Sequence, residues 1–284
     1  MPSLIDIRRR IRSVKNTQQI TKAMKMVSAA KLRRAQDRVI SARPYVTTLR
    51  KVLANVALAA AADEQAGENP LMARREERRI LLVLVTADKG LAGAFNSNLI
   101  RSAQRFITEH PQAEVTLELV GRKGRDFFRK RGGRISGDSL NFARPAFTDA
   151  VPIARKAMDS YSKAEIDAVY LLYNEFKSVV AQRVVLQRVL PVEVPAEAEA
   201  VDYIFEQPPG EMLNALLPRY MEMEIFRSLI ETAAAEHAAR MTAMDAATSN
   251  AGDMIEKLTL YMNRVRQASI TKEIIEVVSG AAAE

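Results

Sequence analysis

Residues 219–279 read RYMEMEIFRSLIETAAAEHAARMTAMDAATSNAGDMIEKLTLYMNRVRQASITKEIIEVVS, with one glycine, Gly252, and no proline. Apolar or small residues recur in this stretch at alternating spacings of three and four, the period of a helix packed along a partner helix. They are Phe226, Ile230, Ala233, His237, Met244, Thr248, Ala251, Ile255, Leu258, Met262 and Val265. Such a helix is about 90 Å long, roughly twice the span of a compact domain of this chain's size. We therefore expect much of it to lie outside the protein's globular part.

The other end of the chain supplies the partner helix. Residues 3–60 follow the same rhythm from Leu4 and Ile7 onward, and the seam becomes polar and small over 17–28. Ser3 can cap the start of this helix, and Pro44 is expected to kink or locally open it because proline lacks an N–H. The two helices are predicted to pair antiparallel.

The C-terminal helix is expected to extend beyond its partner, so that its tip from about Arg264 is unpaired. The apolar side chains of that tip then need cover from outside the chain. They are Ile270, Ile274, Ile275, Val277 and Val278.

Between the two helices, strand and helix patterns alternate across 78–195, which indicates a mostly parallel sheet. Strands are predicted at 79–86, 114–120, 167–173 and 179–190, and helices near 96–110, 123–131 and 149–163. The predicted fold class is α/β: a long antiparallel coiled coil of the N- and C-terminal helices with an inserted Rossmann-like α/β domain. The expected organisation is a helix over 1–62, a loop over 63–77, the α/β domain over 78–195, a linker over 196–210 and a helix over 211–284.

Composition excludes several kinds of site. The chain has no Cys and only two His, His110 and His237, which rules out thiolate chemistry and makes a His metal cluster or a Ser/His/Asp triad implausible. The longest apolar run, 52–62, is too short to span a bilayer, and the arginine-rich N-terminus lacks a signal-peptide pattern. A soluble cytoplasmic protein is the default expectation.

The charge is unevenly distributed. Residues 1–51 contain fourteen Lys or Arg and two Asp, a net charge of +12, while the rest has 28 basic and 32 acidic residues, a net charge of −4. Such a cationic helix needs an anionic partner, which can be nucleic acid, anionic lipid or an acidic protein surface.

The candidate small-molecule sites are weak. Gly90 and Gly93 follow a strand and precede a helix, but they match no nucleotide-binding motif, and a tight turn with Asp88 as its cap explains them better. His237 lies on the seam and is expected to be packed, and His110 lies at a helix end. Glu222, Glu224, Glu231 and Glu236 are interpreted as a solvated helix face. No catalytic residue, cofactor or metal site is predicted.

The methionines near the seam leave two interpretations open. They are adaptable packing residues, or they form a contact surface that does not hold one partner geometry. The residues in question are Met24, Met26, Met241, Met244, Met254 and Met262.

Three long motifs resemble the gamma subunit of F-type ATP synthases. The first is Arg10-Ile11-Arg12-Ser13-Val14 with the run 16–29, NTQQITKAMKMVSA. The second is 239–251, ARMTAMDAATSNA, with 266–281, RQASITKEIIEVVSGA. The third is 86–96, TADKGLAGAFN. The resemblance covers the whole chain, and the absence of a cysteine pair favours the bacterial type over the thiol-switched chloroplast type.

The resemblance implies a non-catalytic rotor. A gamma subunit stands inside the ring of alpha and beta subunits, sits on the membrane c-ring with epsilon alongside, and couples proton-driven rotation of the c-ring to ATP synthesis. One copy per complex is expected, peripheral to the cytoplasmic face of the bacterial inner membrane. It binds no nucleic acid and no cofactor.

The resemblance also implies contact positions. Lys22, Met24, Lys25 and Arg240 match the region that touches an acidic loop of beta, and Gln267, Thr271 and Glu273 match the upper contact with beta. Ile274 and Val277 belong to the tip, 274–278, held in the apolar sleeve of the alpha/beta hexamer. Tyr203 and Glu206 match foot positions near the c-ring and epsilon.

Two other functions are weighed against this one. The first is a basic coiled-coil protein that binds nucleic acid, although 1–51 contain a single aromatic residue, Tyr45. The second is an α/β enzyme that binds a nucleotide at the Gly90 turn.

Overall fold

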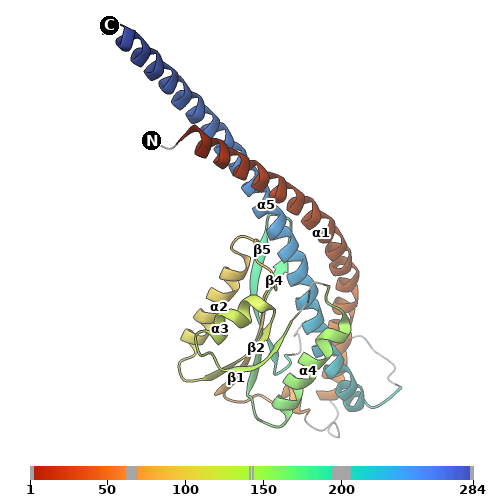
Figure 1. The fold of residues 1–284 in the computed structure, drawn as a ribbon. Coiled ribbons are helices and arrows are strands. Elements are labelled where there is room, and N and C mark those ends of the chain that lie inside the picture. The colour runs from red at the N-terminus through yellow and green to blue at the C-terminus, as the bar shows by residue number, and fades with distance from the viewer. Residues whose placement is uncertain (1–2, 62–68, 141, 143, 194–205, 282–284) are drawn as a thin grey trace. The chain divides into compact units, whose positions relative to one another are not determined.

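The computed structural model describes residues 3–61, 69–140, 142, 144–193 and 206–281. The chain forms two compact units, one of Met1–Ala29 with Arg240–Glu284 and the other of Ala30–Ala239. The helices α1 (Leu4–Ala61) and α5 (Pro209–Ala281) each contribute to both units (Figure 1). The prediction of two long terminal helices is confirmed, and each unit is described in turn.

Helix α1 has the predicted cap at Ser3 but differs from the prediction at Pro44. The Ser3 Oγ atom accepts a hydrogen bond from the Asp6 N–H at 3.2 Å, which caps the first turn. The helix continues without a break through Pro44, so of the two outcomes predicted there, a kink or a local opening, the opening is wrong. The hydrogen bond that Pro44 cannot donate would have reached the carbonyl of Ile40, and both residues lie on an exposed face where water can bind that carbonyl instead.

The larger unit is built on a five-stranded sheet with the order β3-β2-β1-β4-β5. Its strands are β1 (Arg79–Val85), β2 (Glu114–Val120), β3 (Ile135–Ser139), β4 (Ala168–Phe176) and β5 (Gln182–Leu190). Three neighbouring pairs are parallel and only β4 and β5 are antiparallel, which confirms the mostly parallel prediction. Sequence patterns missed β3, because this short edge strand has polar residues and Gly137 where a buried strand has aliphatic ones.

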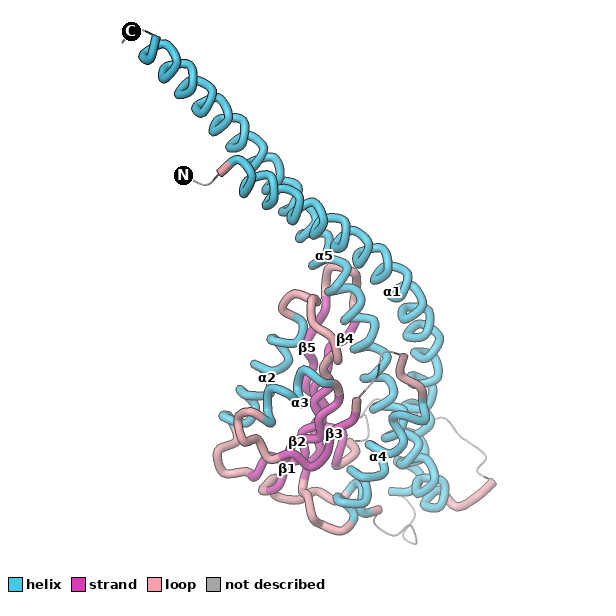
Figure 2. The backbone as a smooth tube through the Cα atoms, in the orientation of Figure 1, coloured by secondary structure: helices cyan, strands magenta, loops and turns pink. Residues whose placement is uncertain are grey.

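Helices cover both faces of this sheet (Figure 2). Leu81, Val83 and Val85 of β1 share a core with α1, α5 and α4 (Phe147–Ser162). The alternate residues of β1 face α2 (Phe95–Glu109) and α3 (Arg122–Arg129), since successive side chains of a strand point to opposite faces. Ile80–Val85 are all buried, as expected of a central parallel strand. A short 3₁₀ turn, η1 (Pro70–Met72), completes the described elements.

Candidate partner-binding surfaces

In the smaller unit, the two helices meet along polar and small side chains. Gln18 Nε2 donates to the carbonyl of Thr248 at 3.4 Å, and the hydroxyls of Thr21 and Thr248 lie 2.8 Å apart. Lys25 Nζ forms an ion pair with Asp245 at 2.6 Å. Along α1 from Gln18 to Lys25, the partner positions on α5 decrease, so the helices are antiparallel as predicted.

Small residues let the two helices of this unit approach closely. Thr21, Ser28 and Ala251 are buried, and a Cβ atom added at Gly252 would lie 3.3 Å from Gln18 Nε2. Apolar packing is concentrated at Ile7 and Met244. The seam over 17–28 therefore depends on short hydrogen-bonding side chains more than on a large apolar core.

The residues matched to the contact with beta's acidic loop differ in exposure. Lys22 is exposed, Met24 and Lys25 are half-buried, and Arg240 is buried. Lys22, Met24 and Lys25 lie within one turn of α1, and Lys25 pairs with the chain's own Asp245. Lys22 therefore offers the most accessible charge of the four.

The C-terminal part of α5 carries the predicted uncovered tip. From Arg264 to Ser279 no described residue is buried. Ile274 is 57% exposed and Val277 is 72% exposed. The upper contact residues Gln267, Thr271 and Glu273 are exposed as well. Among the described residues their side chains bond within the helix, where the Thr271 hydroxyl donates to the Gln267 carbonyl and the Ser269 hydroxyl donates to Glu273. The prediction of bare apolar residues at the tip is confirmed.

The foot positions are only partly described. Glu206 is exposed in a bend just before α5, and Tyr203 lies outside the described residues.

The Gly90 turn is built from internal hydrogen bonds. Asp88 Oδ1 accepts the backbone N–H of Arg122, the first residue of α3, at 3.0 Å, and Asn96 Oδ1 accepts the N–H of Ala87 at 3.0 Å. Leu91 and Gly93 have φ values of 61° and 56°, as in tight turns. Asp88 therefore binds the first N–H of α3 from 34 residues away, whereas the cap expected of it was local to the Gly90 turn.

Gly121 allows the backbone before α3 to pass close to the same turn. Gly121 has φ +91°, and a Cβ atom there would lie 2.1 Å from the Thr86 carbonyl oxygen. Thr86 Oγ1 accepts the N–H of Gly124 at 2.9 Å, so β1 and the start of α3 are joined directly. The polar groups of the 86–96 motif are thus used in bonds within the segment and to the start of α3.

A small pocket lies at the carboxyl end of β1, the end of a parallel strand where Rossmann-like domains bind nucleotides. Thr86 and Asp88 line it together with Leu229 and Thr232 of α5, and its volume is about 10 Å³. This volume holds about one water molecule, so a nucleotide does not fit in this pocket.

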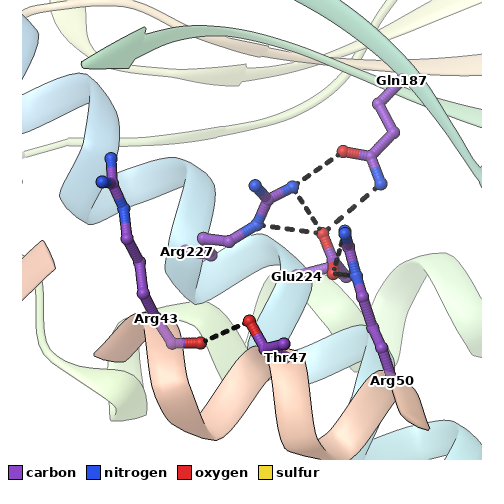
Figure 3. A network of polar contacts seen from close by, with 6 residues as sticks. All are labelled: Arg43, Thr47, Arg50, Gln187, Glu224 and Arg227. Atoms are coloured by element: carbon purple, nitrogen blue, oxygen red, sulfur yellow. Dashed lines mark hydrogen bonds and ion pairs between the residues drawn. The ribbon is translucent and has the colours of Figure 1, made fainter. Parts of the chain in front are cut away.

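The acidic residues of α5 overturn one prediction. Glu222, Glu224 and Glu231 are buried, so the interpretation of a solvated face is wrong for these three. Glu224 forms ion pairs with Arg50 at 2.6 Å and with Arg227 at 2.8 Å (Figure 3). The side-chain amide of Gln187 in β5 donates a hydrogen bond to Glu224 at 3.4 Å.

Glu231 repeats the arrangement seven residues further along α5. It pairs with Arg43 at 3.3 Å and accepts the backbone N–H of Phe176 at 2.9 Å. Arg43 and Arg50 are also seven residues apart, as antiparallel helices require. This matched spacing is the sequence signal that could have revealed the buried pairs.

Comparison with known proteins identifies the family. Residues 3–283 match the family model described as ATP synthase. The ATP synthase gamma chain of Solibacter usitatus is 72% identical over 284 residues, covering 100% of this chain and 99% of that one. The gamma chain of Pelotomaculum thermopropionicum is 50% identical over 287 residues, with 100% and 99% covered. The chain belongs to the ATP synthase gamma-chain family.

Solved structures share the fold of this gamma-family chain. The central stalk and c-ring structure of the Tetrahymena thermophila mitochondrial ATP synthase contains a chain that is 27% identical, with a TM-score of 0.61, covering 80% of this chain and 99% of that one. A chain of the Euglena gracilis mitochondrial ATP synthase rotor has a TM-score of 0.67 at 19% identity, covering 94% and 98%. The second likeness concerns the fold alone.

No helix among the described residues combines the length and apolar character that crossing a bilayer requires. No group of three or more acidic or His side chains among them is arranged to hold a metal ion.

Proposed function

We propose that this chain is the central-stalk rotor subunit of a bacterial F-type ATP synthase. It turns with the membrane c-ring and couples that proton-driven rotation to ATP synthesis in the ring of alpha and beta subunits. The observation that carries the proposal is the 72% identity to a gamma chain over the full length of this chain, together with the uncovered apolar tip of α5. Exposed aliphatic side chains at the end of a helix need a surrounding protein surface.

The proposed role is mechanical. The chain would push beta subunits through their conformations without touching the reacting nucleotide, so it is a non-catalytic subunit of the complex. The small pocket beside Thr86 and Asp88 supports this view, because its volume is about 10 Å³. Equilibrium dialysis of the isolated chain with ATP is expected to give no stoichiometric binding that survives an excess of inorganic tripolyphosphate.

The proposed partners are distributed along the chain. Lys22, Met24, Lys25 and Arg240 face the acidic loop of beta, and the cationic helix therefore has a protein partner instead of nucleic acid. Gln267, Thr271 and Glu273, with the tip residues Ile274 and Val277, contact the upper part of the alpha/beta hexamer. Tyr203 and Glu206 lie toward the c-ring and epsilon. One copy is held peripherally at the cytoplasmic face of the inner membrane.

Co-purification tests this proposal. A tagged chain is expected to isolate alpha, beta and epsilon at one copy per three alpha and three beta subunits. Isolation of nucleic acid in place of these subunits, with an affinity that falls steeply as salt rises, would favour the nucleic-acid alternative.

A further inference from the structure

One pocket of the larger unit is lined by four cationic side chains. Its volume is about 400 Å³, within the range of small-molecule sites. Lys31, Arg34 and Arg38 come from α1, where spacings of three and four place them on one face. Arg144 comes from the segment before α4, so the charges converge from two parts of the chain.

These charges have no acidic partner in the pocket. No Asp or Glu is among its lining residues, and among the described residues no ion pair joins Lys31, Arg34 or Arg144 to a carboxylate. Arg38 donates to the carbonyl of Pro145 at 3.4 Å, which still leaves its positive charge uncompensated. Four like charges around one hollow repel one another, and an anion inside it would relieve that repulsion.

The floor of the pocket is apolar and preformed. Pro145, Ile230 and Ala233 are buried, and the buried ring of His237 also lines it. The four cations can bind a ligand from the rim, while the apolar floor excludes water from one side of the ligand. Charge-assisted hydrogen bonds from Arg and Lys to phosphate oxygens are strongest in such a partly desolvated setting.

We propose that this pocket binds a compact polyanion, a small molecule that carries two or more phosphate groups. A nucleic-acid strand is a poorer occupant, because no Phe, Tyr or Trp lines the pocket for a base to stack on. An acidic protein segment is also a poorer fit, because Arg144, from outside α1, converges with the three α1 cations on one hollow of about 400 Å³. None of its lining residues belongs to the Gly90 turn or to the contact positions assigned to the rotor.

Calorimetric titration of the full-length chain with inorganic tripolyphosphate tests the proposal. The expected result is one saturable site at moderate salt. Arg34→Gln and Arg144→Gln are each expected to weaken binding about tenfold or more, the loss of one charge-assisted hydrogen bond. Because both side chains are exposed, these variants are expected to fold normally, which circular dichroism melting checks.

The matched control is Arg33→Gln. Arg33 is the neighbour of Arg34, is exposed and does not line the pocket, so its loss removes the same charge from the same helix. Binding within about twofold of the unchanged chain is expected, since Arg33 does not line the pocket and salt screens its exposed charge. Equal weakening by Arg33→Gln and Arg34→Gln would overturn the proposal, because it would indicate diffuse attraction. Saturable binding of a glutamate-rich peptide without binding of tripolyphosphate would overturn it in favour of a protein partner.

Discussion

Glu224 is a charged residue held in the interior of the larger unit. Its side chain is 0% exposed, and it is compensated by Arg50 of α1, Arg227 of α5 and Gln187 of β5. A buried carboxylate is tolerated only when its charge and its lone pairs are satisfied. The cluster therefore joins α1, α5 and β5 by directional bonds, which apolar packing alone does not provide.

Removing the charge of Glu224 is expected to destabilise the chain. Glu224→Gln leaves Arg227, whose side chain is 16% exposed, without its partner, and a cost of about 3 kcal/mol is expected. Arg50→Met is expected to cost less, about 1 kcal/mol, because Arg50 is 38% exposed and Glu224 keeps two donors. Urea denaturation measures both, with Lys51→Met, an exposed neighbour, as the control. A Glu224→Gln variant as stable as the control would show that the network adds nothing.

Asp167 gives the stability a dependence on acid pH. The side chain of Arg79 donates to its carboxylate at 2.8 and 3.2 Å, and this bonding lowers the pKa of Asp167 below its usual value of 3.8. A depressed pKa in the folded state contributes stability that is present above the unfolded pKa and is lost as pH falls through the folded pKa. Thermal melts of the wild type and Asp167→Asn are therefore expected to differ at pH 6 and to converge below pH 3.8. A constant difference across this range would contradict the assignment.

Met24 tests the proposed contact with beta. Met24→Lys adds a positive charge beside a loop that the family resemblance makes acidic, and the new attraction is expected to hinder the loop from sliding over α1. Hydrolysis in membrane vesicles should then pump fewer protons per ATP, with the complex still assembled. Thr48→Lys adds the same charge at an exposed position of α1 in the larger unit and serves as the control. Unchanged coupling in Met24→Lys would count against the contact.

At the scale of elements, the tip of α5 is expected to contribute little to the stability of the isolated chain. No described residue from Arg264 to Ser279 is buried, and those from Ile270 to Ser279 are all exposed, so removal of the residues after Ser269 takes away little packing. A chain ending at Ser269 should keep its melting temperature within about 2 °C, because exposed positions contribute little to stability. It should assemble less well with alpha and beta, since its apolar side chains are then missing from their proposed sleeve. A large drop in melting temperature would show that the tip packs on its own chain.

At the scale of the whole molecule, the two units are built from different interactions. The sheet of the larger unit is enclosed by helices on both faces, whereas the smaller unit has a narrow seam with polar bonds at Gln18, Thr21 and Thr248. Segments with little buried apolar surface open more readily than core strands. In low urea, amides of 4–29 and 240–279 are expected to exchange hydrogen for deuterium well before those of β1 and β4. Simultaneous loss of protection everywhere would indicate one cooperative unit.

The sequence alone determined the elements with a strong period. The long helices followed from spacings of three and four, and β1 and β2 followed from continuous or alternating apolar runs, because these patterns reflect burial on known faces. The bare tip was predicted for the same reason, since apolar residues at Ile274 and Val277 had no counterpart on the shorter helix. The family match then proposed functions for motifs that physical chemistry alone interprets as a turn or as a helix-packing seam.

Only the tertiary structure decided what surrounds each polar side chain. Glu224 and Glu231 look solvated in the sequence, because a charged residue is ordinarily exposed and its partners at Arg50 and Arg43 lie far away along the chain. The convergence of Arg144 with the α1 cations was invisible for the same reason. The edge strand β3 was invisible because its polar residues and Gly137 show no aliphatic strand pattern. Local pattern records which face of an element is apolar, whereas charge compensation and pocket formation depend on residues that meet only after the chain has folded.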